Sequence, residues 1–298
     1  MTRLLTNIKK VAVATLNKAM EIDIFTQAAA IAFYTIFSIA PLFILIVSVA
    51  SFFVSEEMIT EQIQLQLNEA IGEDISNNLI QFVSGQTDQP SSFWASILAG
   101  VIMIFGATTV VSQLKYALNR IWNVEEFTIS SIGIFFLGRV ISFAIVLLLS
   151  LLLLISLLAE GAVAMISSFF DHLLPTIPLD LYFYLTVISS NLIAMISFML
   201  IFKILPDVKA RWRDLAVGAL VTTLLFILGK YLIGFYLSTT GDTYRAAGTM
   251  IVFVVWVYYN ILIILLGAIF TQVYTSMFGG EIKPYSFVEI SSQEPVNQ

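Results

Sequence analysis

Five long stretches of this sequence contain no Asp, Glu, Lys or Arg, and they limit the possible folds more than any other feature. They cover residues 24–55, 89–114, 140–159, 181–202 and 246–280, and a sixth apolar stretch, 215–237, is interrupted only by Lys230. A helix needs roughly 20 apolar residues to cross the hydrocarbon core of a bilayer. The sequence therefore predicts an integral membrane protein with little of its mass outside the membrane.

Helices are favoured over a membrane β-barrel, because barrel strands alternate in polarity over about 10 residues and these runs are longer and continuously apolar. Only 11% of the residues are charged, against about 25% in soluble domains. We predict an all-α integral membrane protein, a bundle of six transmembrane helices forming one domain over residues 1–280, with a disordered cytoplasmic tail over 281–298. The spans are expected at about 31–54, 94–113, 140–160, 181–203, 215–237 and 249–275.

Lys and Arg are distributed unevenly between alternate loops. The N-terminal segment, loops 114–139 and 203–214 and the tail hold 12 of them, whereas the intervening loops hold only Arg245. Because cytoplasmic loops carry the excess of basic residues, both termini are predicted to be cytoplasmic. The apolar stretch after Lys10 is too short for a cleavable signal sequence, so the first span is expected to be retained as a signal anchor.

Two connecting segments have the periodicity of short amphipathic helices. In the first outer loop, residues 57–83, apolar residues recur every four positions, as on one face of a helix or of two helices broken near Gly72, and acidic residues occupy the other face. Two interpretations are open: this helix packs on the rest of the protein, which we favour, or it lies on the outer membrane surface. In the first inner loop, residues 113–126, a separate helix is predicted with Leu118 on its apolar face and Trp122 at the level of the lipid headgroups.

Residue types that support catalysis or metal binding are scarce. The chain has no Cys and a single histidine, His172, which excludes thiolate and multi-histidine metal sites. No phosphate-binding loop, serine-hydrolase elbow or zinc-protease motif occurs, and the cytoplasmic acids are not clustered as a metal-dependent nuclease requires. The net charge of −6 gives no support to a nucleic-acid partner. We therefore predict no enzyme activity, no catalytic residue, no metal and no cofactor.

Lys230 is the most distinctive single residue, because it lies inside a predicted span. An ionisable group within the membrane is costly and by default indicates a function. The alternative is that its long side chain extends to the nearby outer interface, and both interpretations stay open. A functional Lys230 would attract an anionic lipid headgroup or pair with an acid such as Glu160.

Five further residues are candidates for contact with a substrate or a lipid. Arg139 is predicted at the cytoplasmic end of the third span, where an interfacial anchor is the alternative, and Arg245 lies on the outer side. Pro41 removes a backbone hydrogen bond from the first span and should kink it, with Ser38 and Tyr34 as polar groups in the preceding two turns.

Other polar groups near or within the spans have structural or lipid-binding interpretations. Tyr34, Asn191 and Asn260 are expected to make interhelical hydrogen bonds. A cytoplasmic basic cluster offers a surface for anionic lipids, although such clusters also serve as topology signals. If an anionic lipid is the ligand, its head should be drawn from this cluster to Lys230 through a groove lined by the first, third and fifth spans. The cluster comprises Lys203, Lys209, Arg211 and Arg213.

Three blocks of sequence resemble one known family. They are AAIAFYTIFSIAPL at 29–42, ALNRIWNV at 117–124, and LPD at 205–207 followed by RWR at 211–213. Together they resemble the YihY/BrkB family, and the resemblance extends over about residues 20 to 276. One departure is Ile269, which stands where the family often has Glu.

The resemblance implies a six-helix protein of the bacterial cytoplasmic (inner) membrane. Some members of the family carry an old label as ribonuclease BN and others a virulence or serum-resistance label, and a lipid-transport role has been proposed for relatives. Combining these points, we expect a transporter or lipid-handling protein without its own ATPase. The alternative is a structural or assembly factor of the cell envelope. Membrane lipids, including an anionic lipid, or another envelope component are the expected partners, and the oligomeric state is left open.

Overall fold

The computed structural model describes residues 2–50, 55–71, 93–125, 180–239 and 245–279, together with short pieces between 73 and 81, between 140 and 151, and at 283–284 and 289–290. These residues are almost entirely helical. In chain order the helices are α1 (Thr2–Glu21), α2 (Ile24–Ala50), α3 (Glu56–Ile71), α5 (Phe93–Ile121), α7 (Asp180–Ile204), α8 (Trp212–Thr239) and α9 (Arg245–Phe278).

Two small antiparallel sheets join the tail of the chain to two loops. Strand β1 (Val124–Glu125) follows α5 and pairs with β4 (Glu289–Ile290), while β2 (Val208–Lys209) follows α7 and pairs with β3 (Lys283–Pro284). Residues 281–298 were predicted to be a disordered tail. Of that tail the structure describes two short segments, 283–284 and 289–290, which are the strands β3 and β4.

Helices lie over five of the six predicted spans, and the third, 140–160, falls largely outside the described residues. Within the described part of the chain, three helical segments are long and apolar enough to cross a membrane: Val187–Ile204, Trp212–Ile233 and Ile251–Phe278. A fourth is obtained if the bent pair Lys9–Glu21 and Ile24–Ser38 counts as one span. The described part of the protein is thus helical with three or four candidate spans.

Helix α1 was not predicted, because its lysines interrupt every apolar run and its pattern is amphipathic. The chain turns by 65° between α1 and α2. At the turn Asp23 has a φ of 55°, in the left-handed region, where a short polar side chain is tolerated better than most. This bend separates the N-terminal segment from the first apolar helix.

The separate helix predicted in the first inner loop is wrong. α5 is continuous from Phe93 to Ile121 and contains both the predicted second span and the amphipathic segment. The apolar face of that segment was correctly identified, since Leu118 and Ile121 are buried. Trp122, predicted at the headgroup level, is also buried, because the end of α5 is covered by other helices rather than by lipid.

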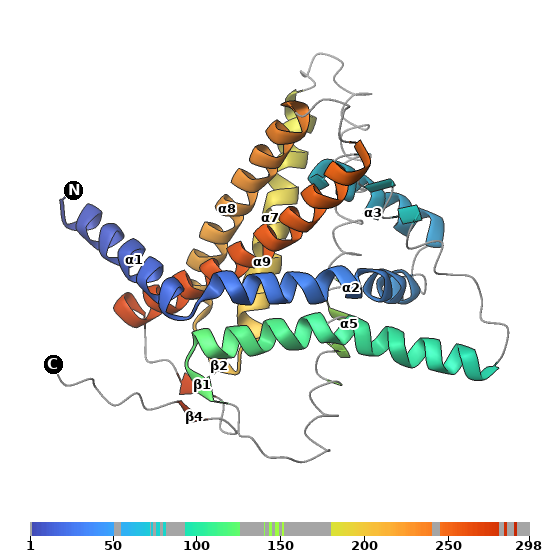
Figure 1. Ribbon diagram of the computed structural model, residues 1–298. Helices are drawn as coiled ribbons and strands as arrows, with labels where there is room; N and C mark the ends of the chain where they lie inside the picture. The colour runs from blue at the N-terminus through green and yellow to red at the C-terminus, as the bar shows by residue number, and fades with distance from the viewer. Residues whose placement is uncertain are drawn as a thin grey trace.

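Helix α9 is the centre of the described structure. It packs against α1, α2, α3, α5 and α8, while α2 pairs with α5 and α7 pairs with α8 (Figure 1). The largest apolar core lies where α5 and α7 end, α8 begins and the second half of α9 passes. Its fully buried side chains include Ile24, Leu118, Phe202, Leu215, Leu265 and Ile269.

The outer-loop helix packs on the protein, as favoured from the sequence. α3 contacts α2, α8 and α9, and its Ile59 and Ile63 are buried. Leu67 packs against a second, smaller core formed by Ala32 of α2 and Phe253 of α9 with their neighbours. The predicted four-residue periodicity therefore marks the face of α3 that meets the other helices.

Candidate functional site

Helices α8 and α9 pack closely along a contact that we call the α8–α9 seam, and three glycines lie in it. Lys230 of α8 lies directly beside this seam. A Cβ at Gly218 would overlap the side chain of Thr271, and a Cβ at Gly267 would overlap that of Thr222. The two contacts are reciprocal, because each helix supplies one glycine and, four residues later, one threonine. Small residues at such positions let helix backbones approach closely within a membrane.

The seam continues towards the far end of α8 with a larger side chain. Tyr259 lies against Gly229, where a Cβ would overlap its ring. The Tyr259 hydroxyl donates a hydrogen bond of 2.6 Å to the backbone carbonyl of Leu225. This bond joins α9 to α8 and satisfies a polar group that would otherwise be costly in hydrocarbon.

Lys230 follows Gly229 directly and lies within the candidate span Trp212–Ile233. Because successive residues of a helix are about 100° apart, Lys230 is turned away from the Gly229–Tyr259 contact. Its side chain is half-buried. Ile233, three residues later on the same side of α8, packs against the smaller core that includes Leu67 of α3. Lys230 is thus one turn from the junction of α2, α3, α8 and α9.

The other predicted site residues are not gathered at one place. On α2, Tyr34 is exposed and its ring makes an edge contact with Phe33, with 6.0 Å between ring centroids, whereas Ser38 is buried. Pro41 lies within α2, which continues through it. Arg245 is the first residue of α9, and Arg139 lies outside the described residues.

The expected interhelical bonds of two amides are wrong. Asn191 donates to the Val187 carbonyl at 2.7 Å, and Asn260 donates to the Trp256 carbonyl at 2.7 Å. Both bonds lie within one helix and span four residues, a local alternative that amide side chains take readily. An interhelical hydrogen bond in this region comes from the Tyr259 hydroxyl instead. The sequence did not single out Tyr259, because many tyrosines in this chain have the same apolar context.

A second polar arrangement lies at the other end of α8 and forms a clasp between α5 and the α7–α8 loop. Asn119 is 1% exposed; its amide donates to Asp207 Oδ2 at 2.9 Å, and its Oδ1 accepts the Asp207 backbone N–H at 2.9 Å. Lys115, one turn earlier on α5, places its Nζ 2.9 Å from the same carboxylate oxygen. We call Lys115, Asn119 and Asp207 the α5–α7 clasp.

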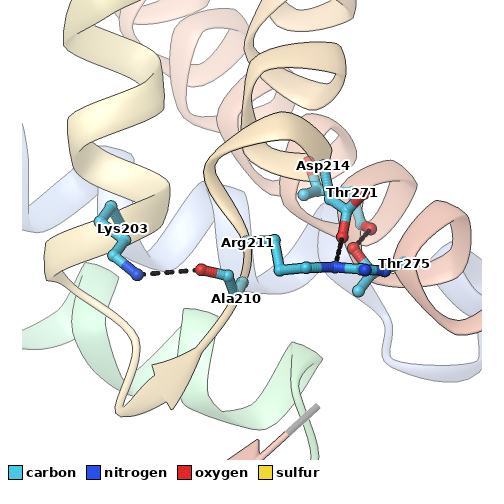
Figure 2. A network of polar contacts seen from close by, with 6 residues as sticks. All are labelled: Lys203, Ala210, Arg211, Asp214, Thr271 and Thr275. Carbon is cyan, nitrogen blue, oxygen red and sulfur yellow. Dashed lines mark hydrogen bonds and ion pairs between the residues drawn. The ribbon is translucent and has the colours of Figure 1, made fainter. Parts of the chain in front are cut away.

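The predicted basic cluster is partly used inside the protein. Lys203 donates to the Ala210 carbonyl at 2.9 Å, and its Nζ lies 5.4 Å from the ring centroid of Trp212. Arg211 lies 3.3 Å from Asp214, beside the last turns of α9 (Figure 2). Lys209, Arg211 and Arg213 are exposed, and Lys203 is half-buried. Three of the four basic residues therefore face outward, where a lipid headgroup could reach them.

No group of three or more His, Cys, Asp or Glu side chains that could hold a metal ion occurs within the described part of the chain. The acids that the structure places in the clasp and at the start of α8 are paired with cations and amides. Their arrangement stabilises loops and helix ends.

Comparison with known proteins decides the family. Residues 15–286 match the family described as Virulence factor BrkB. The chain belongs to the BrkB family. Two of the three blocks that carry the resemblance in this BrkB-family chain meet in the clasp, because Asn119 comes from ALNRIWNV and Asp207 from LPD. Ile269, where the family often has Glu, is fully buried in the main core.

Relatives of this BrkB-family chain are named as membrane proteins. A UPF0761 membrane protein of Legionella pneumophila subsp. pneumophila (strain Philadelphia 1) is 28% identical over 248 residues, which are 81% of this chain and 56% of the relative. One of Yersinia pestis (strain Pestoides F) is 28% identical over 208 residues, 67% of this chain and 64% of the relative. The chain thus spans between about half and two thirds of these curated relatives. No solved structure matches it.

Proposed function

We propose that this protein is a six-span protein of the bacterial cytoplasmic membrane, with both termini in the cytoplasm, that transports or handles a lipid without an ATPase of its own. The observation that carries this proposal is Lys230, a half-buried ionisable residue within a candidate span. Charged residues inside membrane segments are rare and mark substrate pathways or ion pairs. A positive charge at this depth favours an anionic headgroup as the ligand.

The surroundings of Lys230 support an anionic ligand that arrives from the basic side of the protein. Helix α3, which packs against α8, carries the acids Glu57, Glu61 and Glu69, so an anion approaching from that end of α8 meets like charges. At the opposite end, Lys209 and Arg213 are exposed and attract anions electrostatically. The charge distribution therefore favours entry at the start of α8 and movement towards Lys230.

Lipid retention by the purified protein tests the role of Lys230. The protein in detergent is mixed with equal parts phosphatidylglycerol and phosphatidylcholine, and bound lipids are counted by native mass spectrometry. Lys230→Gln should reduce retained phosphatidylglycerol several-fold and leave phosphatidylcholine unchanged. Arg120→Gln, which removes an exposed charge from α5, is the matched control and should change neither. Equal loss of both lipids, or no loss, would show that Lys230 only anchors α8 at the interface.

The membrane orientation is tested with single cysteines, because the natural chain has none. Ser91→Cys and Lys209→Cys should react with an impermeant maleimide from opposite sides of the membrane in intact cells and inverted vesicles. Reaction of both from the same side would overturn the proposed topology.

An assembly factor of the cell envelope is the second candidate, and the exposed side of α3 favours it. Met58 and Leu65 are exposed there beside the acids of the same helix. Such a role predicts that cells tolerate Lys230→Gln but lose function when Met58 and Leu65 are both changed to Ser. A transporter predicts the reverse pattern.

A further inference from the structure

One face of helix α1 is buried against the rest of the protein. Val11, Thr15 and Ala19 are buried and recur every four residues, and Ile22 continues the same side just beyond the helix. This face meets α9, against which α1 packs. The Thr15 hydroxyl donates to the Val11 carbonyl at 2.8 Å, so this face leaves no hydroxyl unsatisfied against the apolar core.

A second face of α1 is apolar but uncovered. Leu16 is 56% exposed and Met20 is 73% exposed, with Val13 completing the row. At about 100° per residue these three side chains fall within about 60° of one another. We call Val13, Leu16 and Met20 the α1 stripe. Lys9 lies on the same line one turn earlier and is also exposed.

A polar flank separates the α1 stripe from the buried face on one side. Lys10, Asn17 and Glu21 are all exposed and lie about 40° to 80° from Val13 around the helix. α1 therefore has three sectors, one against α9, one apolar and one polar. In water, the exposed apolar sector would be unfavourable. In a helix that lies in the plane of a membrane surface, the apolar sector enters the acyl chains and the polar sector faces the water.

Helix α1 lies beside the end of α9 and near the start of α8, two helices that are candidate membrane spans. The C-terminal part of α9 lies beside α1 (Figure 1), and its last turn exposes Met277 and Phe278. The start of α8 is adjacent, because a Cβ at Gly279 after α9 would lie 2.8 Å from Asp214 Oδ2. Trp212, exposed there beneath Lys203, is of the residue type enriched at headgroup level.

We infer that α1 lies on the membrane surface, with the α1 stripe among the acyl chains and Lys9 and Lys10 against anionic headgroups. The bend of 65° between α1 and α2 turns α1 away from the direction of the first apolar helix. Charge favours a lipid surface over a protein partner, because α1 carries cations at four positions and no acid before Glu21.

Single spin labels test the position of α1, since the chain has no natural cysteine. The full protein is placed in nanodiscs of equal parts phosphatidylcholine and phosphatidylglycerol, with labels at Leu16→Cys, Met20→Cys, Asn17→Cys or Glu21→Cys. Labels in the α1 stripe should be relaxed by oxygen and shielded from a water-soluble nickel chelate several-fold more than labels on the polar flank. Equal nickel access at all four positions would overturn the inference.

Two further measurements separate lipid from protein and test the lysines. If a second copy covered the stripe, labels from two copies would broaden one another's spectra at Met20→Cys, and that result would overturn a lipid-facing stripe. In nanodiscs of phosphatidylcholine alone, or with Lys9→Gln and Lys10→Gln together, shielding of the Met20 label should fall. Unchanged shielding would overturn the role assigned to the two lysines. Thermal melting of each variant in detergent confirms that it is folded.

Discussion

Helices α7 and α9 are both apolar enough to span a membrane, yet they differ in how much of each helix is buried inside the protein. In the candidate span of α9, 50% of the residues are buried inside the protein, whereas in that of α7 the share is 11%. α9 is surrounded by α1, α2, α3, α5 and α8. In α7, whose burial is described from residue 187 onward, the buried side chains are Phe198 and Phe202, near the end of the helix. Hydropathy therefore identifies both as membrane helices without distinguishing the central helix from the peripheral one.

The physical reason is that lipid tails are as apolar as leucine side chains. The transfer free energy of an apolar residue in a membrane helix is therefore nearly the same whether it contacts protein or lipid. Composition alone does not show which of the two it contacts. What holds α9 in place is close packing and a few polar contacts. α7 is held by its packing against α8, by its buried last turns, and by the loop that follows, where Asp207 enters the α5–α7 clasp.

The largest expected contrast comes from matched isoleucines. Ile269 of α9 is 0% exposed and Ile188 of α7 is 63% exposed. Ile269→Ala should destabilise the protein by about 2 to 5 kcal/mol because it leaves a cavity in a packed core, and Ile188→Ala should change stability by less than about 0.5 kcal/mol. Reversible unfolding in mixed micelles measures both. Similar losses would mean that α7 is packed against protein as fully as α9 is.

Matched asparagines give a smaller contrast and test how α7 is held. Asn119→Ala removes both hydrogen bonds to Asp207 and should cost about 1.5 to 3 kcal/mol, since one of these bonds is to a charged group. Asn191→Ala on α7 removes only a bond within its own helix and should be near neutral, because Ala is the better helix former. The same unfolding assay applies, and a neutral Asn119→Ala would show that the clasp does not stabilise the end of α7.

The smallest contrast concerns the hydrogen bond across the α8–α9 seam. Tyr259→Phe removes the bond to the Leu225 carbonyl and should cost about 0.5 to 1.5 kcal/mol. Tyr231→Phe, on the exposed side of α8, is the control and should have no measurable effect. The melting temperature of the detergent-solubilised variants provides the comparison. If the two variants melt alike, close packing at the glycines alone holds the seam.

Much of the fold could be predicted from charge-free runs. Burying a charge in hydrocarbon is so costly that membrane segments contain few charged residues, and such segments are easily recognised in a sequence. The same logic identified Lys230 as an exception within α8. The hydrogen-bond partners of single amides were harder to predict. Asn191 and Asn260 each donate to a carbonyl of their own helix, but such a side chain can equally bond to a neighbouring helix. Helix α1 was missed because an amphipathic surface helix carries charges that interrupt the signal for a span.

The sequence by itself determined that the chain is a helical membrane protein, where most of its apolar helices lie, and that it resembles the BrkB family. The first two points follow because solvation of charges and backbone groups depends on local composition, whereas the resemblance rests on three motif blocks. Only the tertiary structure decided that Gly218 and Gly267 meet threonines across a seam, that Asn119 binds Asp207, and that α9 is central. These contacts join residues far apart in the chain, and in a membrane they depend on shape and pairing, which composition does not encode.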